Sequence, residues 1–213
     1  FSNPFQEVLG EVYSGASRGS GTQISWNSGY LIQKLIHEAI MFDTHKCFGV
    51  PMALWYPTFP AQTALYPIRL KKLGISPDMW FSQVKNNHPE SLSEKALFLL
   101  NSIHRNDSVF KEIPFQYVNL RDARIIAEWA AQKLKDFSFC SIHTYVSAAV
   151  RICIAAKECN LNIRNTKFFI AGEPFTKRKR KEIEEVGCEV INTYYFTEGG
   201  FVGCSCNDLE RKN

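Results

Sequence analysis

Three short segments of the sequence combine small, hydroxylated and acidic residues in ways that suit the binding of anions and metal ions. Residues 13–22 are rich in Gly and Ser, so their backbone N–H groups and hydroxyls can approach phosphate oxygens closely. The turn 172–174 reads Gly-Glu-Pro, and its glycine permits close approach of the backbone to a flat ligand. Within residues 192–200, Thr197 offers a hydroxyl for phosphate and Glu198 a carboxylate for Mg²⁺.

Each segment also has an ordinary structural interpretation when it is considered alone. Residues 13–22 could form a flexible hairpin loop. They do not match a Walker A motif, because the Gly-Lys-Ser/Thr ending and the following helix are both absent. The turn 172–174 could simply join a strand to a helix, and residues 192–200 could form a surface loop. The order and spacing of the three segments therefore decide between these interpretations.

The hydrophobic pattern of the chain predicts strands that alternate with helices. We expect strands at residues 8–14, 22–26, 50–56, 137–142, 167–171 and 188–192, and helices at 28–42, 62–73, 91–104, 122–134, 145–159 and 176–186. This alternation predicts an α/β fold of mostly parallel sheets covered by helices, with a strand-loop-strand unit at its start. Ligands of such sheets bind beyond the carboxyl ends of the strands, where two of the three segments fall.

Two of the expected helices have apolar positions at helical spacing, and we expect these positions to be buried. In helix 28–42 they are Ile32, Leu35, Ile36, Ala39 and Ile40. In helix 145–159 they are Val146, Ala149, Val150, Cys153 and Ile154.

Composition excludes several other classes of protein. A formal net charge of +4 is too small to indicate a nucleic-acid-binding protein. In the apolar middle of the chain, residues 137–150 contain no Asp, Glu, Lys or Arg, but this stretch is interrupted by His143 and is too short for a membrane span. An odd number of cysteines, seven, suits a reducing cytoplasm, and no secretory signal is visible. The sequence ends directly after the motif-rich segment, so we expect a fragment of a longer protein; its oligomeric state is left open.

In their order and spacing, the three segments resemble the adenylate-forming superfamily of acyl-CoA ligases and adenylation domains. The sequence Ala-Gly-Glu-Pro at 171–174 is similar to the phenylacetate-CoA ligase-like branch, and the acyl-protein synthetases of bacterial luciferase systems also fit. The resemblance spans about Val8 to Gly203 and rests on element order alone between Phe42 and Phe137. It implies that residues 1–213 are a partial nucleotide-binding large domain, without its N-terminal part and its C-terminal lid domain.

The resemblance also implies a reaction and a set of site residues. A carboxylic acid attacks ATP to give an acyl-adenylate, and a thiol of coenzyme A or of a carrier protein then takes the acyl group. The catalytic residues are Thr197, which contacts the α-phosphate, and Glu198, which binds Mg²⁺. Residues implied in binding ATP or AMP are Ser14, Gly15, Ser17, Arg18, Gly19, Thr22, Gly172, Glu173, Pro174, Tyr194 and Tyr195. Residues implied in binding the acid are His143, Tyr145 and Gly199, with Trp55 and Tyr56 as further pocket candidates and a core histidine as the alternative for His143.

The sequence departs from the family pattern at identifiable positions. Ala16 replaces a hydroxylated residue, and Arg18 is an apparent insertion that supplies the cation a lysine usually provides. Tyr195 stands where a glycine is usual, and the ribose-binding aspartate motif and the catalytic lysine of the lid have no counterpart. The fragment alone is therefore expected to turn over poorly. The alternative function is a degenerate, non-catalytic family member that acts as a binding or interaction module.

Two further features have ordinary explanations. The basic run 177–181 is expected to be a solvated helix face rather than a nucleic-acid patch, because Lys181 and Glu185 are an i,i+4 pair. Cys204 and Cys206 could be half of a zinc site, but a single intervening residue is fewer than ligand pairs usually have.

Overall fold

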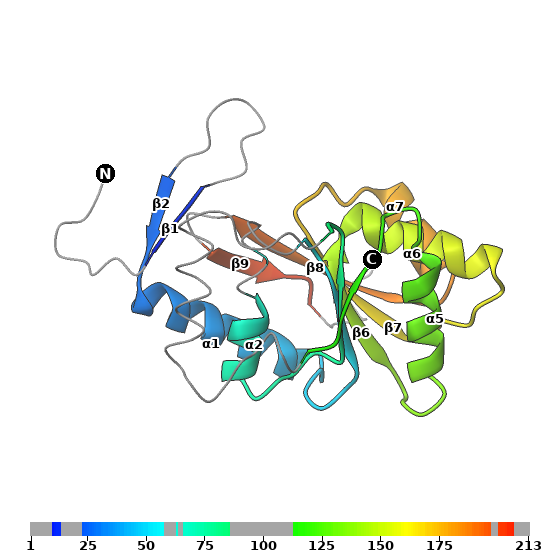
Figure 1. Cartoon of the computed structure of the whole chain (residues 1–213), viewed down its shortest axis with the longest axis horizontal. Helices are drawn as coiled ribbons and strands as arrows, with labels where there is room; N and C mark the ends of the chain where they lie inside the picture. Colours follow the sequence, from blue (N-terminus) through cyan, green and yellow to red (C-terminus); the bar gives the residue numbers. More distant parts are fainter. Residues whose placement is uncertain are drawn as a thin grey trace.

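The protein is an α/β structure built around one large sheet. The computed structural model describes residues 10–13, 23–57, 63, 66–85, 113–196 and 200–206. The seven-stranded sheet has the order β5-β4-β3-β6-β7-β8-β9, and Figure 1 shows helices on either side of it. Its strands are β3 (Met52–Trp55), β4 (Met79–Ser82), β5 (Phe115–Tyr117), β6 (Cys140–Tyr145), β7 (Thr166–Ala171), β8 (Glu189–Phe196) and β9 (Gly200–Cys204).

All neighbouring strands from β5 to β8 pair in parallel, and only β9 is antiparallel to its neighbour. This confirms the expected mostly parallel α/β fold. A separate two-stranded antiparallel sheet joins β1 (Gly10–Tyr13) to β2 (Gln23–Trp26). The two strands flank residues 14–22, so the expected strand-loop-strand unit is present; residues 14–22 themselves lie outside the described residues.

The described helices are α1 (Ser28–Thr44), α2 (Tyr66–Lys72), α5 (Arg124–Lys133), α6 (Val146–Glu158) and α7 (Lys177–Glu184). Successive side chains of a strand point to opposite faces of a sheet. Ala53 and Trp55 of β3 accordingly join the apolar cluster under α5, α6 and α7. Met52 and Leu54 of the same strand join a second cluster under α1 and α2. The sheet is therefore covered on both faces.

The outward face of α1 differs from the expectation. Ile32, Ile36 and Ile40 are 54%, 53% and 59% exposed, whereas Lys34 and Glu38 are buried. The predicted apolar face is wrong because an ion pair of Glu38 with α2 turns the charged positions inward.

The buried face of α6 also differs from the expected one. Ile154 is 40% exposed, and the buried residues are Val146, Ala148, Ala149, Ile152, Cys153 and Ala156. The buried face is therefore made largely of small residues, and the larger Ile154 lies beside it toward solvent.

Several strand boundaries differ from the sequence prediction. The expected strand 137–142 begins instead at Cys140 and runs to Tyr145, because its ladder with β7 covers those residues and Phe137 is exposed. Strands β4, β5 and β9 were not expected, and β8 continues through Phe196 because it pairs with β9. The expected helix 91–104 lies outside the described residues. No helix in the described part of the chain is long and apolar enough to cross a membrane.

Candidate functional site

Four parallel strands bring separate parts of the chain to one edge of the sheet. Trp55 of β3 pairs with Thr144 of β6, and Tyr145 of β6 pairs with Ala171 of β7. Ile170 of β7 pairs with Asn192 of β8, so the residues that follow lie along the same edge. We call this the carboxyl edge; it consists of Tyr56, Tyr145, the turn 172–174 and residues 194–196. Two of the three segments singled out in the sequence meet here, on adjacent strands.

Gly172 is required at the carboxyl edge for two independent reasons. Its φ is +79°, which L-residues with a Cβ rarely adopt. A Cβ at this position would also lie 3.1 Å from the ring of Tyr145. The Tyr145 ring is itself held edge-on against Tyr56 at a centroid distance of 5.1 Å. The turn is therefore packed against an aromatic pair. Burial of Tyr145 raises the pKa of its hydroxyl.

Glu173 connects this turn to helix α6. One carboxylate oxygen accepts a hydrogen bond of 2.7 Å from the backbone N–H of Ser147, and the other accepts one of 2.7 Å from its hydroxyl. Lys179 Nζ lies 3.6 Å from the same carboxylate. Ser147 is in the first turn of α6, where N–H groups lack helical partners and a negative charge is favourable. Glu173 thus caps α6 and sets the position of the turn.

The end of β8 presents two aromatic rings outward. Tyr194 and Phe196 are 62% and 43% exposed, and their ring centroids are 6.1 Å apart. Tyr195 points to the other face, where its ring lies 5.1 Å from that of Phe201. Burial raises the pKa of the Tyr195 hydroxyl well above its usual range. Exposed neighbouring rings of this kind can stack against a flat ligand such as a base.

His143 is buried in the sheet rather than exposed at its edge. It is 2% exposed, and its ring is stacked on Phe169 at 4.3 Å with an interplanar angle of 2°. Nδ1 lies 3.0 Å from the hydroxyl of Tyr66, and Nε2 has no hydrogen-bond partner among the residues that the structure describes. Burial lowers the pKa of His143 to about 3, so the imidazole is neutral at pH 7. This geometry agrees with the core-histidine alternative; a role in binding the acid stays a prediction.

The two further pocket candidates have different surroundings. Trp55 is fully buried, and its indole N–H donates to the carbonyl of Val118. It packs in the cluster under α5 and α6, as a core residue does. The hydroxyl of Tyr56 donates to the carbonyl of Thr144 at 3.2 Å, and its ring remains part of the carboxyl edge.

A group of buried charges beside the carboxyl edge was missed by the sequence interpretation. Glu38 of α1 is fully buried and accepts hydrogen bonds from Arg69 Nε of α2 at 2.9 and 3.2 Å. Lys34 lies one turn earlier on α1, is 8% exposed, and places its ammonium 4.3 Å from the ring centroid of Tyr30. We call Lys34, Glu38 and Arg69 the α1–α2 ion cluster. The sequence feature that could have indicated this cluster is the i,i+4 spacing of Lys34 and Glu38, which places both on one face of the helix.

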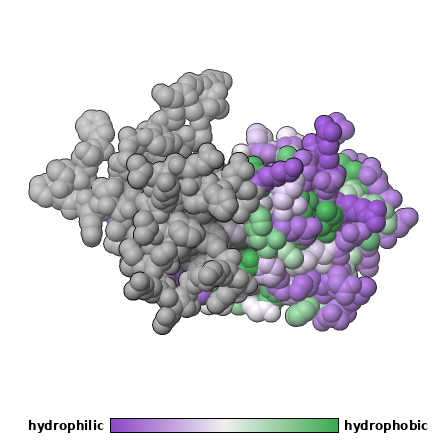
Figure 2. Space-filling model, in the orientation of Figure 1, coloured by the Kyte–Doolittle hydropathy of each residue, from purple (hydrophilic) through white to green (hydrophobic). Residues whose placement is uncertain are grey.

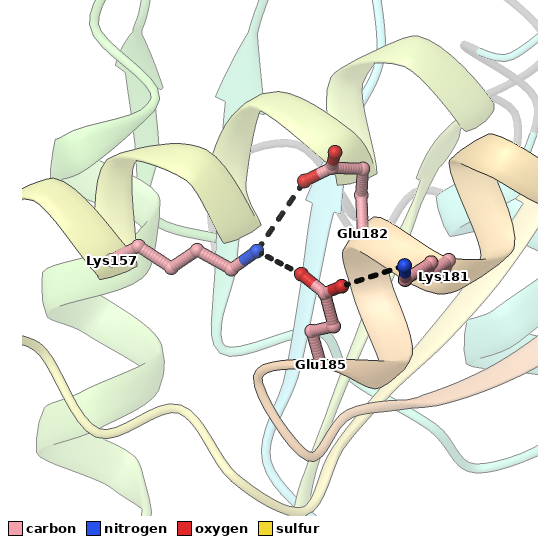
Figure 3. A network of polar contacts seen from close by, with 4 residues as sticks. All are labelled: Lys157, Lys181, Glu182 and Glu185. Atoms are coloured by element: carbon pink, nitrogen blue, oxygen red, sulfur yellow. Dashed lines mark hydrogen bonds and ion pairs between the residues drawn. The ribbon is translucent and has the colours of Figure 1, made fainter.

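The basic run forms part of a solvent-facing ion network. Lys181 pairs with Glu185, as the i,i+4 spacing predicted, and Arg180 pairs with Glu184 in the same way. Figure 3 shows Lys157 of α6 between Glu182 and Glu185, which links the two helices. In Figure 2 the part of the molecule formed by α5, α6 and α7 has a mainly hydrophilic surface. These contacts support the interpretation of a solvated helix face.

Other candidate residues cannot be assigned a geometry. Thr197, Glu198 and Gly199, like the candidate residues of the loop 14–22, lie outside the described residues, so their roles stay predictions. Cys204 Sγ lies 3.9 Å from His45 Nε2. Across the described ranges, no three His, Cys, Asp or Glu side chains come together as metal ligands.

The fold matches that of a solved ligase. The structure of 2-hydroxyisobutyryl-CoA ligase, in complex with 2-HIB-AMP and CoA in the thioesterification state, aligns with 89% of this chain at a TM-score of 0.50 and 14% sequence identity. The chain spans about a third (33%) of the length of that ligase. IdnL1 aligns at a TM-score of 0.33 with 10% identity, covering 83% of this chain and 56% of its own. CmiS6 aligns at 0.31 with 11% identity, covering 90% and 70%. No family model and no curated protein matches the sequence.

Proposed function

We propose that the chain is the nucleotide-binding core of an adenylate-forming carboxylate ligase, similar to the phenylacetate-CoA ligase-like branch. Its reaction joins a carboxylic acid to the α-phosphate of ATP with release of pyrophosphate, and then transfers the acyl group to the thiol of coenzyme A or of a carrier protein. One observation carries this proposal: the turn 172–174 follows β7, and the rings of Tyr194 and Phe196 lie at the end of the adjacent strand β8, at the same sheet edge. The fold shared with a CoA ligase agrees with it.

In this proposal the chain acts by positioning reactants and by neutralising developing charge. The turn 172–174 borders the adenine, and Tyr194 stacks on it. The loop 14–22 holds the β- and γ-phosphates, with Arg18 as its cation. Thr197 contacts the α-phosphate, and Glu198 holds Mg²⁺, which supplies charge neutralisation at the phosphates.

The direction of Tyr195 supports nucleotide binding despite the departure from the family pattern. A bulky side chain at this position would obstruct a ligand if it lay on the exposed side of β8. Tyr195 instead packs inward against Phe201, on the side of the strand opposite to Tyr194. Of the described side chains at the end of β8, those of Tyr194 and Phe196 therefore lie on the exposed side.

Since all seven cysteines are free thiols, a reducing cytoplasm is the proposed location.

Carboxylate-dependent exchange of pyrophosphate into ATP tests the proposal. The full-length protein, with its lid domain, is assayed with a panel of acids, beside the variants Glu198→Gln and Tyr194→Ala and the control Glu158→Gln, a solvent-exposed change on α6. We expect exchange with at least one acid, loss of exchange in Glu198→Gln, weaker ATP binding in Tyr194→Ala, and no change in the control. No exchange with any acid, together with no ATP binding by calorimetry, would overturn the proposal and favour the non-catalytic module.

A further inference from the structure

The α1–α2 ion cluster holds more positive than negative charge in the protein interior. Lys34 and Arg69 are cations and Glu38 is a carboxylate, which gives a formal charge of +1. Glu38 forms a forked pair with Arg69, with N–O distances of 2.8 to 3.2 Å. Within the described residues, no carboxylate oxygen lies within 4.0 Å of Lys34 Nζ, which lies over the ring of Tyr30. Glu38 raises the pKa of Lys34 without pairing with it directly, so in the described part of the chain Lys34 is buried without a counter-ion of its own.

The burial of Lys34 is unfavourable for the folded protein. Desolvation and the nearby Arg69 lower the pKa of its ammonium group to about 8. The desolvation of an unpaired buried charge lowers the stability of the folded protein. An apolar residue of similar length would fill the same volume without this loss of stability. Residues that break a local rule in this way are concentrated at functional sites. An anionic ligand group would complete the cluster by balancing its charge.

The cluster lies beside the candidate nucleotide site. Glu38 and Arg69 both influence the pKa of the Tyr195 hydroxyl, and the same two residues influence that of Tyr66. Tyr195 also packs on Phe201, which in turn lies 5.5 Å from His37 of α1. A ligand that extends from the carboxyl edge past Tyr195 toward α1 would therefore approach the cluster.

We propose that Lys34 is a specificity-determining residue that binds a second anionic group of the acyl substrate, held in place by the Glu38–Arg69 pair. The substrate class is then a dicarboxylic acid, whose first carboxylate is activated at the nucleotide site while the second pairs with Lys34. This inference rests on the proposed function and adds the chemistry of the far end of the substrate.

Exchange assays with matched acids test the inference. Succinate, adipate and suberate are compared with the monocarboxylates of equal chain length. The comparison uses the full-length protein in its unmodified form, in Lys34→Met and in the control Lys181→Met, which changes an exposed lysine of α7. We expect the unmodified protein and the control to prefer one dicarboxylate by about ten- to a hundredfold in kcat/KM, which corresponds to one charge-assisted hydrogen bond. In Lys34→Met that preference is lost.

The remaining outcomes separate the inference from the proposed function. Exchange with monocarboxylates as efficient as with dicarboxylates overturns the inference and leaves the ligase function standing. No exchange with any acid overturns both. If Lys34→Met does not fold, the pH profile of the unmodified protein gives the second test. The dicarboxylate preference should then fall as pH rises through about 8, where Lys34 loses its proton beside Tyr30, Glu38 and Arg69. A preference that is constant across this range contradicts the role of Lys34.

Discussion

The carboxylate of Glu173 caps helix α6 through both polar hydrogens of Ser147, at 2.7 Å each. This contact joins a turn that follows β7 to the helix that follows β6, so it fixes one part of the candidate site relative to its neighbour. The residue that the family resemblance assigns to the border of the adenine therefore has a structural task as well. If a Glu173 variant loses nucleotide binding, the loss could come from the missing cap of α6 or from the missing contact with the adenine. The stability of the variant is therefore measured together with its nucleotide binding.

Replacing Glu173 by Ala should lower the free energy of unfolding by about 1–2 kcal/mol, because a helix N-terminus loses a charged cap. Urea denaturation measures this change. Ser147→Ala removes one of the two hydrogen bonds and should have a smaller effect, and the double variant should lose less than the sum of the two. Exactly additive effects would contradict the direct contact.

Replacing Gly172 by Ala should destabilise the protein more than replacing Gly49. Both glycines have a positive φ, +79° and +71°, but nothing lies within 4 Å of a Cβ at Gly49. Gly49→Ala therefore measures the conformational cost alone, about 1 kcal/mol, while Gly172→Ala adds the contact with Tyr145. Thermal unfolding of both variants compares them, and equal shifts in Tm would show that the ring of Tyr145 yields freely.

The parallel sheet was predictable because strands β6, β7 and β8 have six to eight residues, β3 stands in a continuous apolar run, and the helices between the strands are regular in pattern. Strand β7 and helices α1, α5, α6 and α7 occur close to their expected positions. Strands β4, β5 and β9 have only three to five residues, too few to show a period in the sequence. The extension of β8 depends on pairing with β9, a contact that no local pattern reveals.

The candidate site was predictable only in part, for a related reason. Spacing placed the turn 172–174 and Tyr194 at strand ends, and sheet topology then brings them together. The α1–α2 ion cluster was missed, because Arg69 comes from another helix and only tertiary packing turns Lys34 and Glu38 inward. The apolar positions Ile32, Ile36 and Ile40 led to the prediction that the opposite face of α1 is buried, but these three side chains are exposed in the structure.

Replacing Lys34 by Met should stabilise the protein near neutral pH. The pKa of Lys34 is about 8 in the folded protein and 10.5 in the reference state, so the unfolded chain binds more protons between these values. The stability of the unmodified protein should accordingly rise as pH increases from about 8 to 10.5, by an amount on the order of 3 kcal/mol. Urea denaturation at several pH values should show this rise in the unmodified protein and in Lys181→Met, but not in Lys34→Met. A rise of the same size in Lys34→Met would mean that another group causes it.

His143 should remain neutral throughout the physiological range, because its pKa of about 3 lies far below the reference value of 6.5. The folded state favours the neutral ring, so this contribution to stability is complete above pH 6.5 and is lost as pH falls toward 3. In NMR spectra, the ring signals of His143 should not titrate between about pH 8 and 5. Replacing the hydrogen-bond partner, in Tyr66→Phe, should leave His143 neutral because burial alone lowers its pKa. A midpoint near 6.5 for His143 would show that water reaches the ring, and it would return the residue to the candidates for binding the acid.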